Sequence, residues 1–279
     1  MSGSAGGNRI KRADVKPTVD HYIKNVLSKY DKFEDCVTTG SYNASDKQDF
    51  GDIDIVIQLN VSDKQQGKKD FAEFLTTFPT NIIVPFRSVK YKGKRFLNTG
   101  EIITILYPII DDKGFVQIDN MLSISSEETQ FKFKFLNLPA IKQGLMLGLI
   151  KAIALENPKS VQKFTVAHPL KHNEEFEFNL SSSGLTLRLV ELSDDYKVLN
   201  RRDIWKSTNW KDVEHILQDY DFNKSFESIL SDIKKNLKNK RSLNRIKGIF
   251  KSMVSVKTGE VDTPKGTEKE YALNKVASL

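Results

Sequence analysis

The chain has 279 residues, enough for one large domain or two smaller ones. Hydrophobic residues make up 39% and charged residues 28%, as in ordinary globular proteins, and no apolar run approaches the roughly 20 residues that cross a bilayer. Cys36 is the single cysteine, so no intrachain disulfide can form, which fits a reducing compartment. We expect Cys36 to have a packing role. Because the N-terminus also lacks the apolar core of a secretory signal, we expect a cytoplasmic protein.

The net charge of +7 is concentrated toward the C-terminus. Residues 223–257 contain ten Lys or Arg residues and two acidic residues, which gives this segment a net charge of +8. The remainder of the chain is therefore close to neutral. A basic block of this kind favours a polyanionic partner such as nucleic acid. A solvated helix face gives the same pattern, and both interpretations stay open.

The N-terminal half mixes helical and strand patterns. Apolar residues at three- and four-residue spacing predict a helix from Pro17 to Phe33. A short β-prone run from Cys36 to Thr39 ends at Gly40. Residues 52–59 are predicted to form a strand because every odd position is apolar, and residues 64–77 are predicted to form a helix.

Beyond Pro79 the sequence favours strands. We expect them at residues 81–89, 95–97, 101–110 and 115–119, with a basic turn at 90–94 and a tight turn at 111–114. Gly114 suits the left-handed position of the second turn, which would join the last two strands in an antiparallel pair.

The C-terminal half begins with a helical pattern at residues 138–155, where we place the domain boundary. Alternating apolar residues on either side of the turn 181–184 predict a β-hairpin. Three helical stretches are expected at 194–204, 210–220 and 225–253. The last has basic residues on a wide face and an apolar stripe opposite.

Two acidic residues occupy alternate positions at the start of the strand 52–59. Asp52 and Asp54 therefore point to the same face, and two neighbouring carboxylates favour a cation between them. Oxygen ligands of this kind suit Mg²⁺ or Mn²⁺. Asp119 ends a later strand and joins the pair if the two strands are neighbours; Asp111 and Asp112 are rivals for this third position. Three carboxylates can hold two metal ions that activate a hydroxyl, with Asp119 as the candidate general base.

The turn after the first predicted strand supplies a second feature. A glycine at position 40 lets the backbone approach a phosphate closely, and the Ser41 hydroxyl with nearby amides can donate hydrogen bonds to it. A polar-faced strand beside a tight turn would show the same residues without a function, which is the alternative interpretation.

Gly40-Ser41, followed after nine residues by Gly51-Asp52-Ile53-Asp54-Ile55, resembles the signature of the polymerase-beta nucleotidyltransferase superfamily. The resemblance covers residues 37–120. It implies an α+β fold with a nucleotidyltransferase-like mixed sheet and flanking helices. It also implies that Gly40 and Ser41 bind the nucleotide phosphates, that Asp52 and Asp54 bind metal, and that Asp119 completes the site. The implied cofactor is Mg²⁺ (or Mn²⁺), as two ions, and the implied substrate is an NTP, ATP included.

Together these patterns predict four segments. We expect a flexible leader at 1–15, a nucleotidyltransferase catalytic domain at 16–137, a mainly helical C-terminal domain with a β-hairpin and a basic helix at 138–258, and a polar tail at 259–279. Candidate contacts to nucleic acid are the following basic residues: Lys92, Lys94, Arg95, Lys234, Lys235, Lys238, Arg241 and Arg245.

The predicted reaction transfers a nucleoside monophosphate from an NTP to a hydroxyl, with release of pyrophosphate. The basic block favours RNA as acceptor, at a tRNA-like or other 3′ end. Two alternatives stay open. One is transfer to a protein side chain or a small molecule, as in an AMPylator or an antibiotic adenylyltransferase; the other is a non-catalytic nucleic-acid-binding module on the same fold. The residues leave open the NTP, single addition against tailing or cyclic-nucleotide synthesis, and the oligomeric state.

Overall fold

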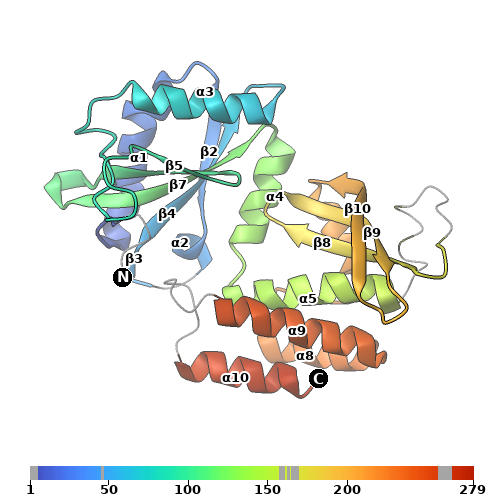
Figure 1. Ribbon diagram of the computed structural model, residues 1–279. Coiled ribbons are helices and arrows are strands. Elements are labelled where there is room, and N and C mark those ends of the chain that lie inside the picture. Colours follow the sequence, from blue (N-terminus) through green and yellow to red (C-terminus); the bar gives the residue numbers. More distant parts are fainter. Residues whose placement is uncertain (1–5, 45–46, 157–160, 162–163, 165–169, 257–265) are drawn as a thin grey trace. The chain divides into compact units, whose positions relative to one another are not determined.

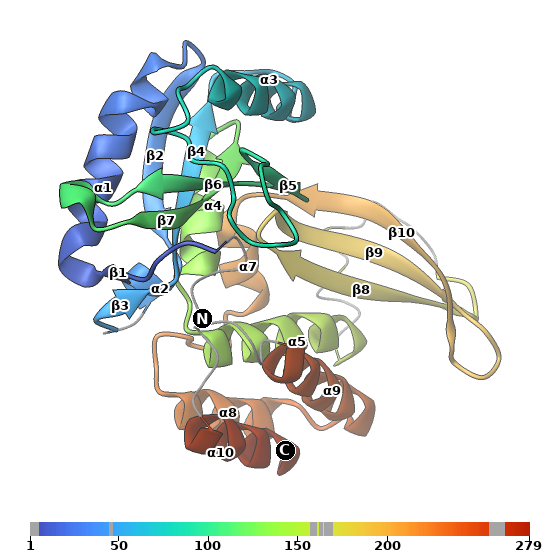
Figure 2. The same cartoon turned by 60° about the vertical axis from the view of Figure 1, so that its left-hand side comes forward.

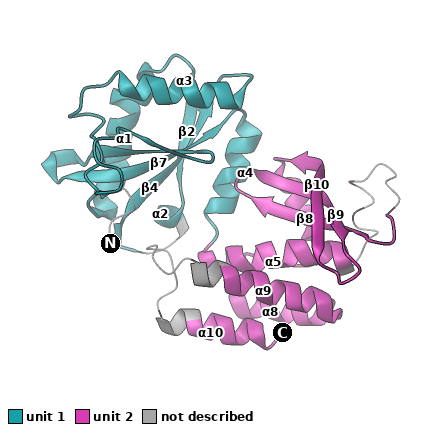
Figure 3. Cartoon of the chain, in the orientation of Figure 1, with its two compact units in different colours: residues 1–138 teal, residues 139–279 magenta. Residues whose placement is uncertain are grey.

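The computed structural model describes residues 6–44, 47–156, 161, 164, 170–256 and 266–279. The chain divides into two units, residues 1–138 and 139–279, and each is described by itself (Figure 3). This division falls one residue after the boundary expected from the sequence.

A five-stranded mixed sheet forms the centre of the first unit, with strand order β2-β4-β7-β6-β5 (Figure 1). Its strands are β2 (Phe33–Thr39), β4 (Asp52–Leu59), β5 (Leu97–Thr99), β6 (Ile102–Pro108) and β7 (Phe115–Ser123). β4 and β7 run parallel, and the other neighbouring strands run antiparallel. The mixed α+β class predicted from the sequence is therefore confirmed.

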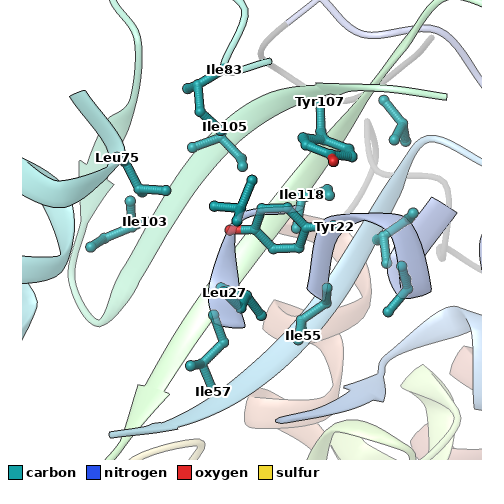
Figure 4. Packing of buried hydrophobic residues seen from close by; sticks show 14 of the residues in the cluster. Tyr22, Leu27, Ile55, Ile57, Leu75, Ile83, Ile103, Ile105, Tyr107 and Ile118 are labelled. Carbon is teal, nitrogen blue, oxygen red and sulfur yellow. The ribbon is translucent and has the colours of Figure 1, made fainter. Parts of the chain in front are cut away.

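The main core of this unit lies on one face of the sheet, under α1 (Arg12–Asn25) and α3 (Lys64–Thr76). Ile55 and Ile57 of β4 point into it and pack with Tyr22 of α1 and Leu75 of α3 (Figure 4). The side chains of a strand alternate between its two faces, so burial of the odd positions of β4 sends its aspartates to the opposite face.

The opposite face is partly covered by α4 (Ser126–Leu136), which packs on β2, β4 and β7. Ser125 caps this helix by accepting a hydrogen bond from the Glu128 amide at 3.2 Å. Thr129 of α4 lies 2.6 Å from the Ser123 hydroxyl at the end of β7. The start of the helix thus contacts the carboxyl end of β7, whereas Asp52 and Asp54 lie at the amino end of β4.

Cys36 of β2 packs against the main core. Burial, and to a smaller extent the charge of Asp35, raises the pKa of the Cys36 thiol to about 12. A thiol with so high a pKa is protonated at neutral pH and is a poor nucleophile. These observations agree with the packing role predicted for Cys36.

The N-terminal elements differ from the predicted helix 17–33. α1 begins at Arg12 and ends at Asn25; the 3₁₀ helix η1 (Leu27–Lys29) follows, and Phe33 already belongs to β2. β1 (Ile10–Lys11) pairs with β3 (Asp49–Phe50), so residues 10–15 lie in regular structure although a flexible leader was expected. An ion pair of 2.7 Å between Asp14 and Lys113 also holds this region. Both contacts join residues far apart in sequence, which periodicity cannot reveal.

Residues 81–89 do not form the predicted strand. Only Val84 pairs there, in an isolated bridge to Leu106. The chain instead makes a loop closed by hydrogen bonds from the Phe86 amide to the Lys94 carbonyl (2.7 Å) and from the Gly93 amide to the Phe86 carbonyl (3.0 Å). Residues 86–95 are called the basic loop below.

The second unit combines helices with a three-stranded antiparallel sheet of order β10-β9-β8. Its strands are β8 (Glu174–Ser181), β9 (Gly184–Leu192) and β10 (Val198–Ser207). Its described helices are α5 (Ala140–Glu156), α7 (Trp210–Ile216), α8 (Phe226–Asn236), α9 (Lys240–Val256) and α10 (Gly266–Ala277). α5 packs on both β8 and α9 (Figure 2). The predicted β8–β9 hairpin is confirmed.

Three predictions for this unit are wrong. Residues 194–204, expected to be helical, contribute most of β10, which pairs with β9. The single basic helix expected at 225–253 is divided into α8 and α9 because Leu237 adopts an extended conformation after α8. Residues 266–277 of the expected polar tail form α10, where Ala272 and Val276 are buried. Residues 259–265 of that tail lie outside the described residues.

Among the described helices, none alone has both the length and the apolar composition needed to cross a membrane. The bent pair formed by α4 and α5 meets that test only when the two helices are counted together.

Candidate active site

The register of the central sheet places two of the predicted acids side by side. Asp54 of β4 pairs with Asp119 of the parallel strand β7. Thr39 of β2 pairs with Asp54 on the other side, and Thr104 of β6 pairs with Asp119. Paired residues on neighbouring strands share a face, so Thr39, Asp54, Asp119 and Thr104 form one row across four strands, called the acid row below.

Asp52 lies on the same face, two residues before Asp54, and pairs with Gln117 of β7. The carboxylates of Asp52, Asp54 and Asp119 are all partly exposed. Within the described part of the chain, no group of three His, Cys, Asp or Glu side chains is gathered closely enough to hold a metal ion as it stands. The donor set still fits Mg²⁺ or Mn²⁺, because it consists of carboxylate oxygens on adjacent rigid strands.

Two polar side chains that the sequence analysis missed hold the carboxylate of Asp119. The Thr104 hydroxyl donates a hydrogen bond to its Oδ1 at 2.5 Å. Nε2 of Gln117 donates to both oxygens, at 3.1 and 3.0 Å. Both donors are buried, so they fix the orientation of the carboxylate. Gln117 lies two residues before Asp119 on β7, so the two side chains share a face of the sheet. This two-residue spacing is the sequence signal that could have identified Gln117 as a partner of Asp119.

Gly40 contacts the acid row directly. Its φ is +74°, in the left-handed region, and a Cβ placed on it would lie 2.1 Å from Oδ2 of Asp54. No other residue type fits there without displacing the Asp54 carboxylate. Ser41 follows and begins the four-residue helix α2 (Ser41–Ala44), and the Asn43 amide donates to the Gly40 carbonyl at 3.1 Å. The turn therefore brings the backbone of Gly40 and Ser41 next to Asp54.

The rival acids for the third position lie elsewhere. Asp111 and Asp112 belong to the tight turn η2 (Ile110–Asp112) between β6 and β7, and both have positive φ values, 60° and 55°. Asp111 is 3.5 Å from the ammonium group of Lys113. The strand register thus gives Asp119, and neither rival, a place beside Asp54.

The predicted nucleic-acid contacts in the basic loop have different environments. Lys92 and Lys94 are exposed. Arg95 instead donates hydrogen bonds to backbone carbonyls at the end of α3, at 2.7 Å to Thr76 and also to Phe78. Its guanidinium group therefore anchors the loop to α3.

The predicted contacts in the second unit also fall into two groups. Lys234, Lys235 and Lys238 are exposed. Arg241 and Arg245 of α9 instead form ion pairs with the buried Glu175 of β8, at 2.7 and 2.9 Å. These two arginines neutralise a buried acid inside the unit, which the amphipathic pattern of α9 did not reveal.

No protein-family profile and no curated protein sequence matches the chain. Among solved structures, it is similar to Cid1 poly(U) polymerase bound to magnesium and 3′-dATP, with 12% identity and a TM-score of 0.31. It is similar also to a Cid1 variant bound to MgATP (13%, 0.32) and to Cid1 bound to MgGTP (12%, 0.30). Each comparison covers 94% of this chain and 92% of the other. Scores this low carry no inference about activity.

Proposed function

We propose that this chain is a metal-dependent nucleotidyltransferase of the polymerase-beta type, which transfers a nucleoside monophosphate from an NTP to a hydroxyl and releases pyrophosphate. The strongest support is the register of β4 and β7, which sets Asp54 beside Asp119 with Asp52 on the same face. The contact of Gly40 with the Asp54 carboxylate adds a backbone turn at the same place, where its amides can bind a phosphate.

Each residue has a role in this proposal. Asp52, Asp54 and Asp119 would hold Mg²⁺ or Mn²⁺, which supplies neutralising charge for the triphosphate and lowers the pKa of a bound hydroxyl. The backbone at Gly40 and Ser41 binds the nucleotide phosphates through its amides, aided by the Ser41 hydroxyl. Asp119 accepts the proton of the attacking hydroxyl.

The acceptor in this proposal is an RNA 3′ end. Its support is the basic block of residues 223–257, where Lys234, Lys235 and Lys238 are exposed and can contact phosphates. Arg241 and Arg245 contribute less to this support, because both are engaged with Glu175.

The proposal is tested by incubating the chain with each α-³²P-labelled NTP, Mg²⁺ and total cellular RNA. Asp52→Ala combined with Asp54→Ala should reduce transfer to background. Asp20→Ala is the matched control, because Asp20 is an exposed carboxylate of α1 paired with Lys16 at 2.7 Å; it should transfer as the wild type does.

Label in RNA that requires intact Asp52 and Asp54 supports the proposal and names the nucleotide. Label in protein or in a small molecule would support nucleotidyl transfer but would show that the acceptor is not RNA. No label with any NTP, or equal labelling by the double variant, would show that the acids are not a transfer centre and would favour a binding module.

A further inference from the structure

A pocket with a volume of about 590 Å³ lies at the edge of the sheet in the first unit. It is lined by Thr76 at the end of α3 and by residues of the basic loop and of the edge strand β5, among them Tyr91, Lys94, Arg95, Leu97 and Asn98. Its volume falls within the range of about 300–1,000 Å³ that is usual for ligand sites. None of the roles proposed above uses it.

The sheet register relates this pocket to the acid row. Leu97 of β5 pairs with Thr104, which in turn pairs with Asp119. Neighbouring strands are about 4.8 Å apart, so the pocket begins roughly 10 Å from Asp119. The turn of Gly40 and Ser41 follows β2, at the other edge of the sheet. A ligand in the pocket and a triphosphate on the turn would therefore approach the acids from opposite sides.

Phe86 and Tyr91 of the basic loop pack on the same face as the acids, whereas Arg95 holds the end of the loop to α3. Tyr91 lies against a small cluster formed by Val84, Phe86 and Leu106, to which Leu97 also packs. Leu106 pairs with Gln117 and so shares the face of Asp52 and Asp119. The Tyr91 wall of the pocket thus belongs to the face on which the proposed reaction occurs.

The chemistry of the pocket fits a single-stranded nucleic acid. Residues 86–96 contain five Lys or Arg residues and no acid. The Tyr91 ring is partly exposed, and the Lys90 ammonium lies 5.1 Å from its centroid. Lys94 is exposed at the rim, whereas Asn98 of β5 pairs with Ile103 and so lies on the opposite face of the sheet. An aromatic ring on which a base can stack and a cation for a phosphate are the usual components of a single-strand site.

We propose that this pocket binds the nucleotides just upstream of the 3′ end of a single-stranded RNA acceptor, with a base stacked on Tyr91 and a phosphate on Lys94. The proposal rests on the proposed function, which makes Asp119 the acid next to the attacking hydroxyl. The pocket lies beyond Asp119 and away from the Gly40 turn, which assigns it to the acceptor and not to the incoming NTP. The acceptor is single-stranded because a base within a duplex is already stacked and cannot cover the ring.

Binding is measured first, by fluorescence anisotropy with a fluorescein-labelled single-stranded oligoribonucleotide of mixed sequence, the full chain and no NTP. Tyr91→Ala should weaken binding about 5- to 150-fold, the effect of losing one stacked base, and Tyr91→Phe should retain it. Lys94→Gln should reduce the slope of log affinity against log salt by about 0.7, as expected for one lost phosphate contact. Lys69→Gln, an exposed lysine of α3, is the matched control and should change neither quantity.

Steady-state transfer then separates the acceptor from the nucleotide. The proposal predicts a raised KM for RNA and an unchanged KM for NTP in Tyr91→Ala and Lys94→Gln. A raised KM for NTP alone would assign the pocket to the nucleotide and overturn the proposal, and so would unchanged RNA affinity in variants whose unfolding midpoints match the wild type. If the wild-type chain binds RNA through Tyr91 and Lys94 but transfers no nucleotide, the pocket stands as an RNA site and the proposed function fails.

Discussion

At the scale of single residues, Gly40 connects the phosphate turn to the acids. Its positive φ, and the 2.1 Å that would separate an added Cβ from the Asp54 carboxylate, make an alanine there doubly unfavourable. We expect Gly40→Ala to destabilise the chain by about 1–2 kcal/mol through its backbone and to lower nucleotidyl transfer about a hundredfold by displacing Asp54. Urea unfolding and transfer assays measure the two effects.

Gly100→Ala is the control for this prediction. Gly100 also has a positive φ, +56°, but nothing lies within 4 Å of its Cβ position. The control should therefore lose similar stability and keep its activity. Equal losses of activity in the two variants would mean that the Gly40 effect is one of stability alone.

Thr104 is a positioning residue for Asp119. Its hydroxyl donates to Asp119 at 2.5 Å, and Thr104→Val removes that donor with little change in shape. We expect transfer to need about 10- to 100-fold more Mg²⁺ or to slow by a similar factor, as when a hydrogen bond to a metal ligand is lost. Thr186→Val, at a buried threonine of β9, is the control. An unchanged Mg²⁺ dependence in Thr104→Val would argue against this role.

The sequence revealed some of these residues and not others. Asp52 and Asp54 share a face because of the two-residue period of a strand, which can be read locally. Thr104 and Gln117 become visible only when β6 and β7 are known to be neighbours and their register is known. Pairing between strands is set by the whole sheet, so a single sequence does not show it.

At the scale of elements, a cluster of ion pairs connects α3, α4 and the start of β6. Glu101 lies 2.9 Å from Lys64 of α3 and 2.7 Å from Lys132 of α4. Burial alone would raise the pKa of Glu101, but hydrogen bonds from Lys132 and Lys64 outweigh it and lower that pKa from 4.5 to about 2. The Lys132 side chain is only 1% exposed, so keeping its positive charge depends on the ion pair with Glu101.

This cluster predicts a pH-dependent stability. A carboxyl whose folded pKa lies below its unfolded value stabilises the fold above the unfolded pKa, and that stability is lost as pH falls through the folded pKa. Glu101→Gln should therefore lower the free energy of unfolding by about 2 kcal/mol at pH 7, after allowance for solvent screening. The difference from wild type should shrink between about pH 4.5 and pH 2. A difference independent of pH, by urea unfolding, would contradict this role of the charge.

The elements that were predicted wrongly depended on long-range pairing or on a missed cap. Apolar and polar residues alternate poorly along β10, and its pairing with β9 decides its structure. The break between α8 and α9 had a local signal: Oδ1 of Asn239 accepts a hydrogen bond from the Arg241 amide at 2.8 Å, as a helix N-cap does. Conversely, β4 has the predicted bounds because its apolar alternation is uninterrupted.

At the scale of the whole molecule, the net charge of +7 and the exposed lysines of the basic block predict salt-sensitive RNA binding. Replacing Lys234, Lys235 and Lys238 together by Gln should reduce the slope of log affinity against log salt by up to about 2, or about 0.7 for each lost phosphate contact. The KM for NTP should not change. A slope equal to that of the wild type would favour the alternative of a solvated helix face.

The order of helices and strands along the chain could be predicted from the sequence better than their arrangement in space. The alternation of helices and strands indicated a mixed fold followed by a mainly helical region, and the structure agrees. The strand order β2-β4-β7-β6-β5 and the third strand of the second sheet were not predicted, because both depend on contacts between distant segments.

The position of metal and nucleotide relative to Asp52, Asp54 and Asp119 tests the proposed reaction most directly. Crystals soaked with Mn²⁺ and an α,β-methylene NTP analogue, recorded at the manganese absorption edge, would locate both. We predict an anomalous peak within coordination distance of the carboxylates of Asp52 and Asp54, with the triphosphate against Gly40 and Ser41. A manganese peak away from the acid row, or an analogue bound elsewhere in the chain, would contradict it.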